Sequence, residues 1–482
     1  MKNQIKTNVE EIEIINEGLV EISVPKFDKV SSSAPVFYNP RMELNRDISI
    51  LALQTFQEEV NREINICDVF GGSGIRAIRY KKEINGVGEV FLNDISSLAI
   101  EQSKINSIAN NVDIEIHQKE ANIFLRENRG MFDVIDIDPF GTPSYFLDSA
   151  SYSLKKDSLL CVTATDTSAL CGTYKEPCIR KYNAKPYKSE YYHENGIRIL
   201  AGFVGLTLAK YKKYIEDIKL SHSSEHYMRL YIKINKGSAA TDESLANNIG
   251  HIIHCKKCLF RKAITGLTTT IPEICPVCRE KIVVAGPMWI GKLQNSEFIA
   301  KMIEKLSEDN PKISENNPNI TENNYNVIEN NPKISENNYD VSEDNPNVSE
   351  DNPKIGEDNP NITENNYNVI ENNPNVSEDN LNINENNYNI NENNINRKII
   401  NTEKKALKLL NSCFEESNAP ITSYDIHVIC RNLKISAPKL ESIMDKIKEE
   451  GFIATKTHFN PVAIKSDIEI EKLKDIVKLL SV

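Results

Sequence analysis

Three consecutive residues, Asp138, Pro139 and Phe140, combine hydrogen-bond acceptors with an aromatic ring. They follow the apolar sequence VIDI at 134–137, which predicts a strand covered on both faces, and the proline and Gly141 prevent that strand from continuing. In a doubly wound α/β sheet, the carboxyl ends of the strands form the ligand crevice. The three residues are therefore predicted to project into such a crevice.

The chemistry open to these residues concerns an amino group on a flat ring. An exocyclic amine conjugated to a base ring is a poor nucleophile, so acceptors must draw its hydrogens while the ring is held in place. Asp138 and the carbonyl of Pro139 could accept, and Phe140 could stack. The DPF sequence is similar to the corner used by amino-group methyltransferases. The alternative is a carboxylate that caps the following turn beside a core phenylalanine.

Three earlier predicted strands also end in polar or glycine-rich sequence. The first ends at Asp68 and leads into GGSG at 71–74, the second ends at Asp94, and the third leads into Glu120 and Ala121. Glycines permit a ligand to approach the backbone closely, and a carboxylate after the second strand binds ribose hydroxyls. The adenine edge of such a ligand would lie near Glu120.

The fourth strand decides among the possible nucleotide ligands. The glycine-rich turn alone fits NAD, FAD or S-adenosylmethionine, or is only a tight turn. A nicotinamide enzyme gives no role to DPFG at 138–141, whereas a methyltransferase uses all four strand ends. We therefore predict an α/β fold with a Rossmann-like class I methyltransferase sheet and S-adenosyl-L-methionine as methyl donor.

An ordered lead-in precedes the first of these strands. Residues 19–30 alternate as in a strand, and an amphipathic helix is predicted from Ile48 to Val60 with Asp47 as its N-cap. Arg46, just before it, is either a solvated loop charge or a guanidinium that reaches a carboxylate in the crevice.

Length and charge indicate several modules. A chain of 482 residues is too long for one core, and its net charge of −12 is unevenly distributed. Residues 308–396 hold 19 acidic side chains and 3 lysines, which leaves the remainder at about +4. The predicted modules are therefore slightly basic, which is compatible with a nucleic-acid partner.

The opening sequence has no apolar core and resembles no signal peptide, and no stretch approaches the length of a membrane span. We expect a cytoplasmic protein with no membrane and no obligate protein partner. Ten cysteines in that compartment indicate metal binding or free thiols. Two Cys-x2-Cys pairs separated by sixteen residues predict a closed structural Zn2+ site, formed by Cys255, Cys258, Cys275 and Cys278.

A seven-residue repeat of the NPKISEN type fills residues 308–396. Proline recurs and few apolar residues remain, so a coiled coil is excluded. A solvated disordered linker is predicted, with a thin β-solenoid as the alternative. The predicted modules are a methyltransferase domain at 1–240, a zinc-binding module at 241–306, the repeat insert at 307–397 and a last domain at 398–482.

The last domain has a winged-helix-like α+β pattern. One helix is predicted from Asn401 or Thr402 to Glu416, a second from Thr422 or Ser423, and a third from Ser436 to Gly451. A hairpin in FIATKTHFNPVAIK and a final helix follow. The usual partner of a winged helix is nucleic acid, and a purely structural domain is the alternative.

A loop predicted at residues 167–194 alternates cations with tyrosines. Cations suit phosphates and aromatic rings suit splayed bases, so this composition is typical of an RNA-facing loop, although about half of the tyrosines would be ordinary packing. The cations are Lys175, Arg180, Lys181, Lys185 and Lys188, and the tyrosines are Tyr174, Tyr182, Tyr187, Tyr191 and Tyr192.

Several longer motifs strengthen this interpretation. DVFGGSGIRAIR, VFLNDIS, DIDPFGTP, VTATDTSALCG, CIRKYNAKPYKSEYYHENGIRIL and THFNPVAIK together resemble the archaeal form of the tRNA guanine-26 N2-dimethyltransferase family. The resemblance covers roughly residues 35–300 and 400–465. It implies that S-adenosylmethionine donates two methyl groups to N2 of one tRNA guanine.

The resemblance also implies residue roles. The cofactor residues would be Arg46, Arg76, Asp94, Glu120 and Ala121, with Asp138 in the catalytic corner. Glu120 departs from the family, which often has aspartate there. The rival hypotheses are N6 methylation of adenine at the same corner, and a non-catalytic zinc and winged-helix protein that binds nucleic acid.

Overall fold

The computed structural model describes residues 12–25, 36–308 and 400–481. The repeat insert, and with it the prediction of disorder, lies outside the described residues. The described residues on both sides of the insert belong to one compact unit. No helix within the described ranges has both the length and the apolar composition needed to cross a membrane.

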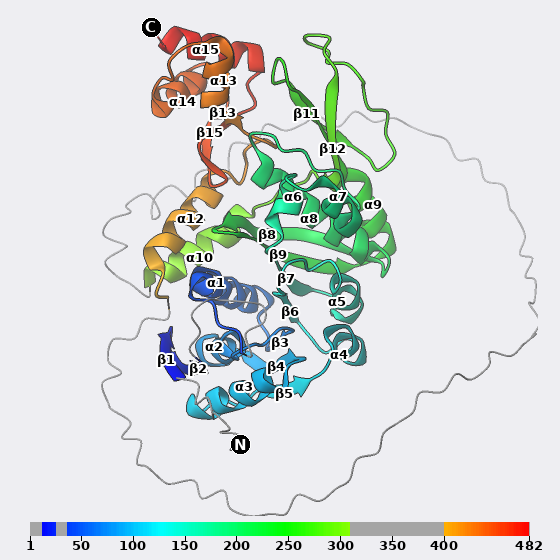
Figure 1. Cartoon of the computed structure of the whole chain (residues 1–482), viewed down its shortest axis with the longest axis vertical. Coiled ribbons are helices and arrows are strands. Elements are labelled where there is room, and N and C mark those ends of the chain that lie inside the picture. The colour runs from blue at the N-terminus through cyan, green and yellow to red at the C-terminus, as the bar shows by residue number, and fades with distance from the viewer. Residues whose placement is uncertain (1–11, 26–35, 309–399, 482) are drawn as a thin grey trace, which may run out of the picture. The chain divides into compact units, whose positions relative to one another are not determined.

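A seven-stranded sheet forms the centre of this unit, which confirms the predicted α/β class (Figure 1). Its order is β5-β4-β3-β6-β7-β9-β8, and the first five strands are parallel. The strands are β3 (Ile64–Asp68), β4 (Val87–Asp94), β5 (Glu115–Gln118), β6 (Val134–Ile137), β7 (Ser158–Ala164), β8 (Lys213–Ser224) and β9 (Tyr227–Lys236). The β8–β9 pair is antiparallel, and β8 is the edge strand.

Helices cover both faces of the sheet, because parallel strands are joined by crossovers that bury them (Figure 1). One layer contains α1 (Glu43–Val60), α2 (Ile75–Glu83) and α3 (Ser97–Ala109). The other contains α4 (Ala121–Glu127), α5 (Leu147–Ser153) and α8 (Tyr192–Ala209). The central strands are accordingly buried along their length; all four residues of β6 are buried.

The lead-in to the sheet differs from the prediction. Residues 12–25 form a hairpin of β1 (Ile12–Glu17) and β2 (Val20–Pro25), of which only the second strand was expected. A 3-10 helix, η1 (Pro40–Met42), then leads into α1, which begins at Glu43, so the prediction that Asp47 caps it is wrong. The Asp47 carboxylate instead pairs with Arg79 at 2.8 Å and accepts from the Thr402 amide at 2.8 Å.

The segment after β7 is more regular than the predicted loop. It contains α6 (Thr167–Leu170) and α7 (Lys175–Tyr182). The cysteine-rich region that follows β9 carries a second sheet, in which β10 pairs with both neighbours. Its elements are α9 (Ser238–Asn248), β10 (Ile249–Cys255), β11 (Arg261–Thr265) and β12 (Ile282–Trp289), followed by α10 (Ser296–Glu308).

Residues 400–481 form helices and a third small sheet of order β13-β15-β14. The elements are α12 (Glu403–Glu415), β13 (Tyr424–Asp425), α13 (Ile426–Leu433), α14 (Leu440–Glu449), β14 (Thr455–Thr457), β15 (Asn460–Lys465) and α15 (Ile470–Leu480). The helices and hairpin lie where the sequence placed them, but two starts were wrong. Asp425 caps α13 by accepting from the Val428 amide, and α14 begins at Leu440 after the proline at 438.

Candidate catalytic and cofactor site

The strand ends named from the sequence meet at one edge of the parallel sheet. Asp94 closes β4, and its carboxylate accepts from the amides of Gly72 and Ser96, each at 2.9 Å. Gly72 (φ +53°) and Gly74 (φ +83°) adopt the left-handed conformation that glycine tolerates best. The turn after β3 is thereby held against the end of β4, and its residues 71–74 are buried there.

The third strand end brings two more predicted residues to this edge. Glu120 is the N-cap of α4 and accepts from the Ile123 amide at 3.1 Å and the Asn122 side chain at 3.0 Å. Ala121, the first residue of that helix, is buried. Ile95, directly after Asp94, is 70% exposed. An exposed isoleucine among polar strand ends provides apolar surface for the flat base of a nucleotide.

The DPF corner directly follows β6. Phe140 is 53% exposed, and its ring packs edge-on against Phe37 with centroids 4.2 Å apart. The Asp138 side chain is 16% exposed, and its Oδ2 accepts from the Arg76 guanidinium. Within the described residues no partner is recorded for Oδ1, so one carboxylate oxygen remains open to a substrate.

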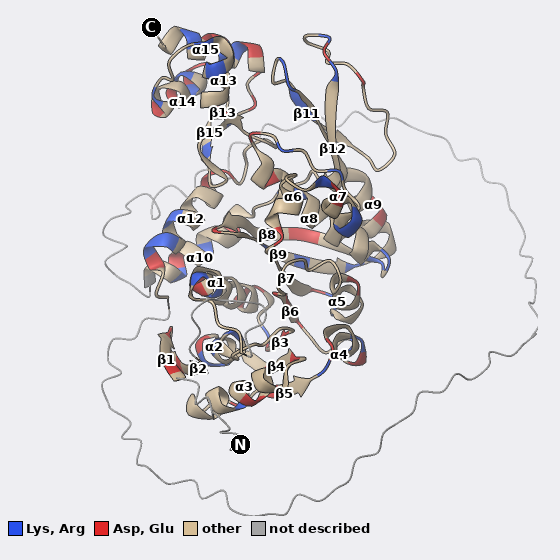
Figure 2. Ribbon diagram, in the orientation of Figure 1, with Lys and Arg blue, Asp and Glu red and all other residues tan. Residues whose placement is uncertain are grey.

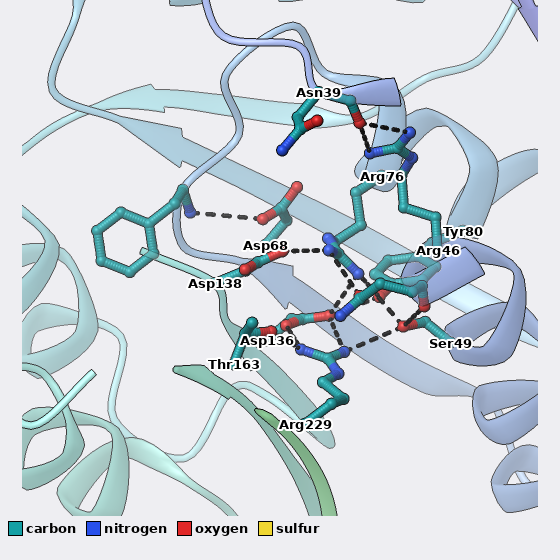
Figure 3. Close-up of polar contacts among 12 residues, drawn as sticks. Asn39, Arg46, Ser49, Asp68, Arg76, Tyr80, Asp136, Asp138, Thr163 and Arg229 are labelled. Carbon is teal, nitrogen blue, oxygen red and sulfur yellow. Dashed lines mark hydrogen bonds and ion pairs between the residues drawn. The ribbon is translucent and has the colours of Figure 1, made fainter. Parts of the chain in front are cut away.

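Beneath this corner lies a set of buried charges, here named the corner cluster: Asp68, Arg76, Asp136, Asp138 and Arg229 (Figure 3). Arg229 in β9 donates to both oxygens of Asp136, at 2.6 and 2.7 Å. Arg76 in α2 bridges Asp136 and Asp138. The carboxylate of Asp138 is therefore oriented by a guanidinium that is itself fixed by a buried ion pair.

The two most buried acids of the corner cluster, Asp136 and Asp68, have pKa values shifted in opposite directions. Burial alone would raise the pKa of Asp136, but the charges of Arg229 and Arg76 outweigh burial and lower the pKa to about 2. Burial raises the pKa of Asp68 to about 7, and Arg76 offsets this only in part. Asp68 Oδ2 is buried with no hydrogen-bond partner, so a donor or cation on a bound ligand would satisfy it.

Arg46 and Arg76, the two predicted cofactor arginines, lie in different ion pairs. Arg46 binds both oxygens of Glu17 at 2.5 Å and also donates to the Asn39 carbonyl. Arg46 thereby ties the β1–β2 hairpin to the residues that precede α1. Arg76 faces the corner cluster, as described above. Both side chains are almost fully buried, so neither is the solvated loop charge that was the alternative for Arg46.

The corner is also held from the neighbouring strand β7. The Gly141 amide donates to Thr165 Oγ1 at 2.7 Å, and the Thr165 amide donates to the Gly141 carbonyl at 2.9 Å. Asp166 accepts from the Tyr182 hydroxyl at 2.7 Å, and Tyr182 in turn accepts from Thr142 at 2.8 Å. These bonds connect the corner to α7.

Asp136 and Arg229 were not predicted as part of the site, and Tyr182 was predicted only as part of an RNA-facing loop. The only signal for Asp136 was a charged residue inside the otherwise apolar strand sequence VIDI. A charge there has to be paired, because an unpaired buried carboxylate is very costly. The pairing partner Arg229 lies 93 residues later, and nothing in the local sequence identifies it.

The four predicted zinc ligands come together in the second sheet region. Their sulfur atoms all lie within 4.8 Å of one another. Cys255 and Cys278 are 3.4 Å apart, and Cys258 and Cys275 are 3.5 Å apart. These separations exceed a disulfide bond of about 2 Å and fit four thiolates around one tetrahedral ion with metal–sulfur bonds of about 2.3 Å.

A second buried set of charges, the C-terminal cluster, consists of Glu194, Arg198, Glu416, His458 and Lys465. Glu194 pairs with Arg198 at 2.8 Å and with Lys465 at 3.0 Å, which joins α8 to β15. His458 donates to Glu416 and accepts from the Ser223 amide at 3.3 Å. Cys413 lies near this histidine, but the ring is already satisfied and Lys465 supplies the positive charge, so the cluster needs no metal.

Comparisons with known proteins agree with this geometry. The family model described as N2,N2-dimethylguanosine tRNA methyltransferase matches residues 18–371 and 376–478. The tRNA (guanine(26)-N(2))-dimethyltransferase of Methanobrevibacter smithii is 52% identical over 471 residues, which is 98% of each chain. The tRNA (guanine(26)-N(2)/guanine(27)-N(2))-dimethyltransferase of Aquifex aeolicus is 42% identical over 299 residues, 61% of this chain and 76% of its own.

Among solved structures, Trm1 from Pyrococcus horikoshii in complex with S-adenosyl-L-methionine superposes with a TM-score of 0.70. That protein is 29% identical, and the match covers 96% of this chain and 99% of the other. The sheet edge, the corner and the sequence matches thus agree over nearly the whole chain. The chain is a methyltransferase that belongs to the N2,N2-dimethylguanosine tRNA methyltransferase family.

Proposed function

We propose that this protein transfers methyl groups from S-adenosyl-L-methionine to the exocyclic N2 of guanine 26 in tRNA, giving N2,N2-dimethylguanosine. The observation that carries the proposal is the DPF corner. Asp138 presents a carboxylate that Arg76 orients through one oxygen, beside the exposed ring of Phe140. This arrangement suits an amino group on an aromatic base better than a hydroxyl or a thiol.

The cofactor pocket in this proposal is the edge formed by the turn at 71–74 and the ends of β4 and β5. Asp94 would accept from ribose hydroxyls, and Glu120 and Ala121 would face the adenine. Arg46 and Arg76, the other two predicted cofactor residues, would act by fixing the segments around the pocket, because their guanidinium groups are engaged by Glu17 and by the corner cluster. The oxygen of Asp68 that has no hydrogen-bond partner among the described residues suits a ligand with polar and cationic groups.

In the proposed mechanism, bound S-adenosylmethionine supplies an electrophilic methyl group, and the chain positions the amine. The target guanine leaves its stack, which costs a few kcal/mol, and Phe140 offsets part of that cost by stacking. Asp138 and the carbonyl of Pro139 accept hydrogen bonds from the amino group, so that the nitrogen lone pair is directed at the methyl group. As the C–N bond forms and the S–C bond of the donor breaks, leaving S-adenosylhomocysteine, the nitrogen would lose one proton to the open oxygen of Asp138. No covalent enzyme intermediate is required.

The test is nucleoside mass spectrometry of a tRNA transcript incubated with the protein and methyl-labelled donor. We expect labelled N2,N2-dimethylguanosine from a transcript with guanine at position 26, and none when that guanine is replaced by adenine. Labelled N6-methyladenosine would instead support the alternative activity, N6 methylation of adenine. Donor binding and RNA binding without any methylated product would favour the non-catalytic alternative.

We also propose that the four cysteines hold a structural Zn2+ ion. The support is the convergence of four sulfurs without an open position for a substrate. Cys275→Ser should remove most of one equivalent of zinc, measured by metal analysis of the purified protein. Cys430→Ser is the matched control, because Cys430 is also buried but lies outside this cysteine group. Equal zinc content in both variants would refute the proposal.

The domain division is part of the same proposal: a methyltransferase domain at 1–240, a zinc module at 241–306, a repeat insert at 307–397 and a winged-helix-like domain at 398–482 that binds tRNA. Four helices and a small sheet in the last range support the winged-helix assignment. A tRNA substrate accords with a cytoplasmic location.

A further inference from the structure

The stretch between residues 173 and 188, here named the α7 segment, exposes four cations: Lys175, Arg180, Lys185 and Lys188. In the described part of the chain, none of the four has an ion-pair or side-chain hydrogen-bond partner, whereas Lys181 pairs with Asp166 at 3.0 Å. Figure 2 shows this positive charge on α7. Exposed cations without an acidic partner favour binding of an anion.

Five lysines of α14, β14 and α15 provide a contrast. Each of them lies 2.8 to 3.0 Å from an acidic side chain, and Figure 2 shows both signs of charge on these helices. The five are Lys446, Lys456, Lys472, Lys474 and Lys478. Such exposed pairs add little stability, but each one neutralises a charge that a phosphate would otherwise contact.

Two apolar or aromatic side chains stand among the cations of the α7 segment. Tyr174 is 61% exposed and Ile179 is 46% exposed. An exposed tyrosine between lysines can stack on an unpaired base while the cations contact the backbone phosphates. The surface therefore fits single-stranded or locally opened RNA better than a protein partner.

The α7 segment is attached to the catalytic corner. Tyr182 at the end of α7 bonds to Asp166 and to Thr142, at 2.7 and 2.8 Å. The amides of Thr165 and Asp166 donate to the Gly141 carbonyl, which follows Phe140 directly. A nucleic-acid strand on the α7 segment would therefore run beside the corner that receives its base.

We propose that the α7 segment binds the tRNA backbone next to the target nucleotide and supplies the main electrostatic contact near the site. The proposal rests on the proposed function, because it assigns a surface to the tRNA substrate. Residues 400–481 also expose cations that have no acidic partner within the described ranges, among them Lys404, Lys408, Lys439 and Lys448, so the α7 segment is assigned only the contact near the corner.

The test compares two triple variants with the same loss of charge. The first carries Lys175→Ala, Arg180→Ala and Lys188→Ala; the control carries Lys446→Ala, Lys474→Ala and Lys478→Ala. We expect the first to raise the KM for tRNA roughly 10- to 100-fold with little change in kcat, and to flatten the dependence of log Kd on log salt by about 2 to 3. The control should stay close to the wild type in both.

A charge-conserving variant keeps the test decisive. Lys175→Arg, Arg180→Lys and Lys188→Arg together should retain tRNA affinity, and donor binding should be unchanged in all three proteins. Equal losses in the first variant and the control, or an unchanged salt dependence in the first, would overturn the proposal. If the wild type binds tRNA through these cations yet yields no dimethylguanosine, the proposed function fails while the assignment of the surface stands.

Discussion

The corner cluster and the C-terminal cluster both pair carboxylates with cations below the surface, but they differ in how fully the carboxylates are paired. In the C-terminal cluster every member is buried, and Glu194 is neutralised by both Arg198 and Lys465. In the corner cluster Asp138 reaches the surface and Asp68 keeps an oxygen without a partner. The two glutamate oxygens of the C-terminal cluster that lack a hydrogen bond, Glu194 Oε2 and Glu416 Oε2, still face the Lys465 ammonium at 3.0 and 3.8 Å, whereas the corner cluster leaves acceptors open on the side of the crevice.

The difference shows how buried charge can hold a fold or prepare a site. A complete cluster fixes two elements far apart in sequence, here α8 and β15. An incompletely paired cluster keeps acceptors oriented but lowers the stability of the fold. A ligand that donates to those acceptors offsets this loss when it binds. Variants that remove one partner from each cluster should separate the two roles.

The largest effect should come from Arg229→Met, which leaves Asp136 with only Arg76 and Tyr80. Loss of a bidentate partner from a fully buried carboxylate should cost about 3–5 kcal/mol of unfolding free energy, and methyl transfer should fall with it because Asp138 loses its fixed support. Chemical denaturation and single-turnover assays measure both. Lys236→Met at the exposed end of the same strand is the control and should change little.

Asp138→Ala should leave the fold intact and remove the open acceptor. We expect the rate of the chemical step to drop by about 2.7–4 kcal/mol, or 100- to 1,000-fold, with donor affinity within a few-fold of the wild type. Single-turnover rates and donor titration make the comparison, with Asp148→Ala in an exposed ion pair as control. Equal losses in donor affinity and rate would mean that Asp138 serves the cofactor.

Lys465→Met should affect the C-terminal cluster alone, at about 1–3 kcal/mol, because Arg198 still neutralises Glu194. Burial would raise the pKa of Glu194, but Lys465 and Arg198 lower it to about 2 from 4.5. Its stabilising contribution is present above pH 4.5 and is lost as the pH falls through 2. The variant should lose part of that acid dependence, and hydrogen exchange should show residues 400–481 opening first while donor binding persists.

The smallest change, and the one of opposite sign, should come from Asp68→Asn. Burial raises the pKa of Asp68 from 3.8 to about 7, so the wild type loses stability as the pH rises from about 4 to 7. The variant lacks this loss, and its melting temperature should exceed that of the wild type by more at pH 8 than at pH 4. Donor affinity should fall. A variant less stable than the wild type at pH 8 would contradict the idea of an unsatisfied carboxylate.

The sequence predicted the parallel strands and their polar ends correctly. Both are local features: an apolar run forms the strand, and a glycine, proline or acidic residue ends it. Asp94, Glu120 and Asp138 accordingly lie where the sequence placed them. Asp47 was misassigned because an acidic residue before an apolar run fits an N-cap locally, whereas its partners Arg79 and Thr402 are distant. Local signals cannot reveal a pairing that only the tertiary fold creates.

The same limit applied to the site. Arg76 was recognised, but its contacts with Asp136 and Asp138 join residues about 60 positions apart. The sequence identified the cations and tyrosines of the α7 segment, but it did not show which of them are exposed and without an acidic partner. Tyr182 and Tyr191 are buried, Tyr174 is exposed, and only the structure separates the lysines that have acidic partners from those that do not.

Helices α10 and α12, which flank residues 309–399, pack against each other and against α1. The Thr402 amide and hydroxyl both donate to Asp47 in α1, at 2.8 and 2.7 Å. The described chain thus ends at 308 and resumes at 400 beside the same helix, α1. The contacts between residues 36–308 and residues 400–481 come from their packed surfaces and do not depend on the peptide that connects them. Two separately translated polypeptides, ending at 308 and starting at 400, should assemble into one working enzyme.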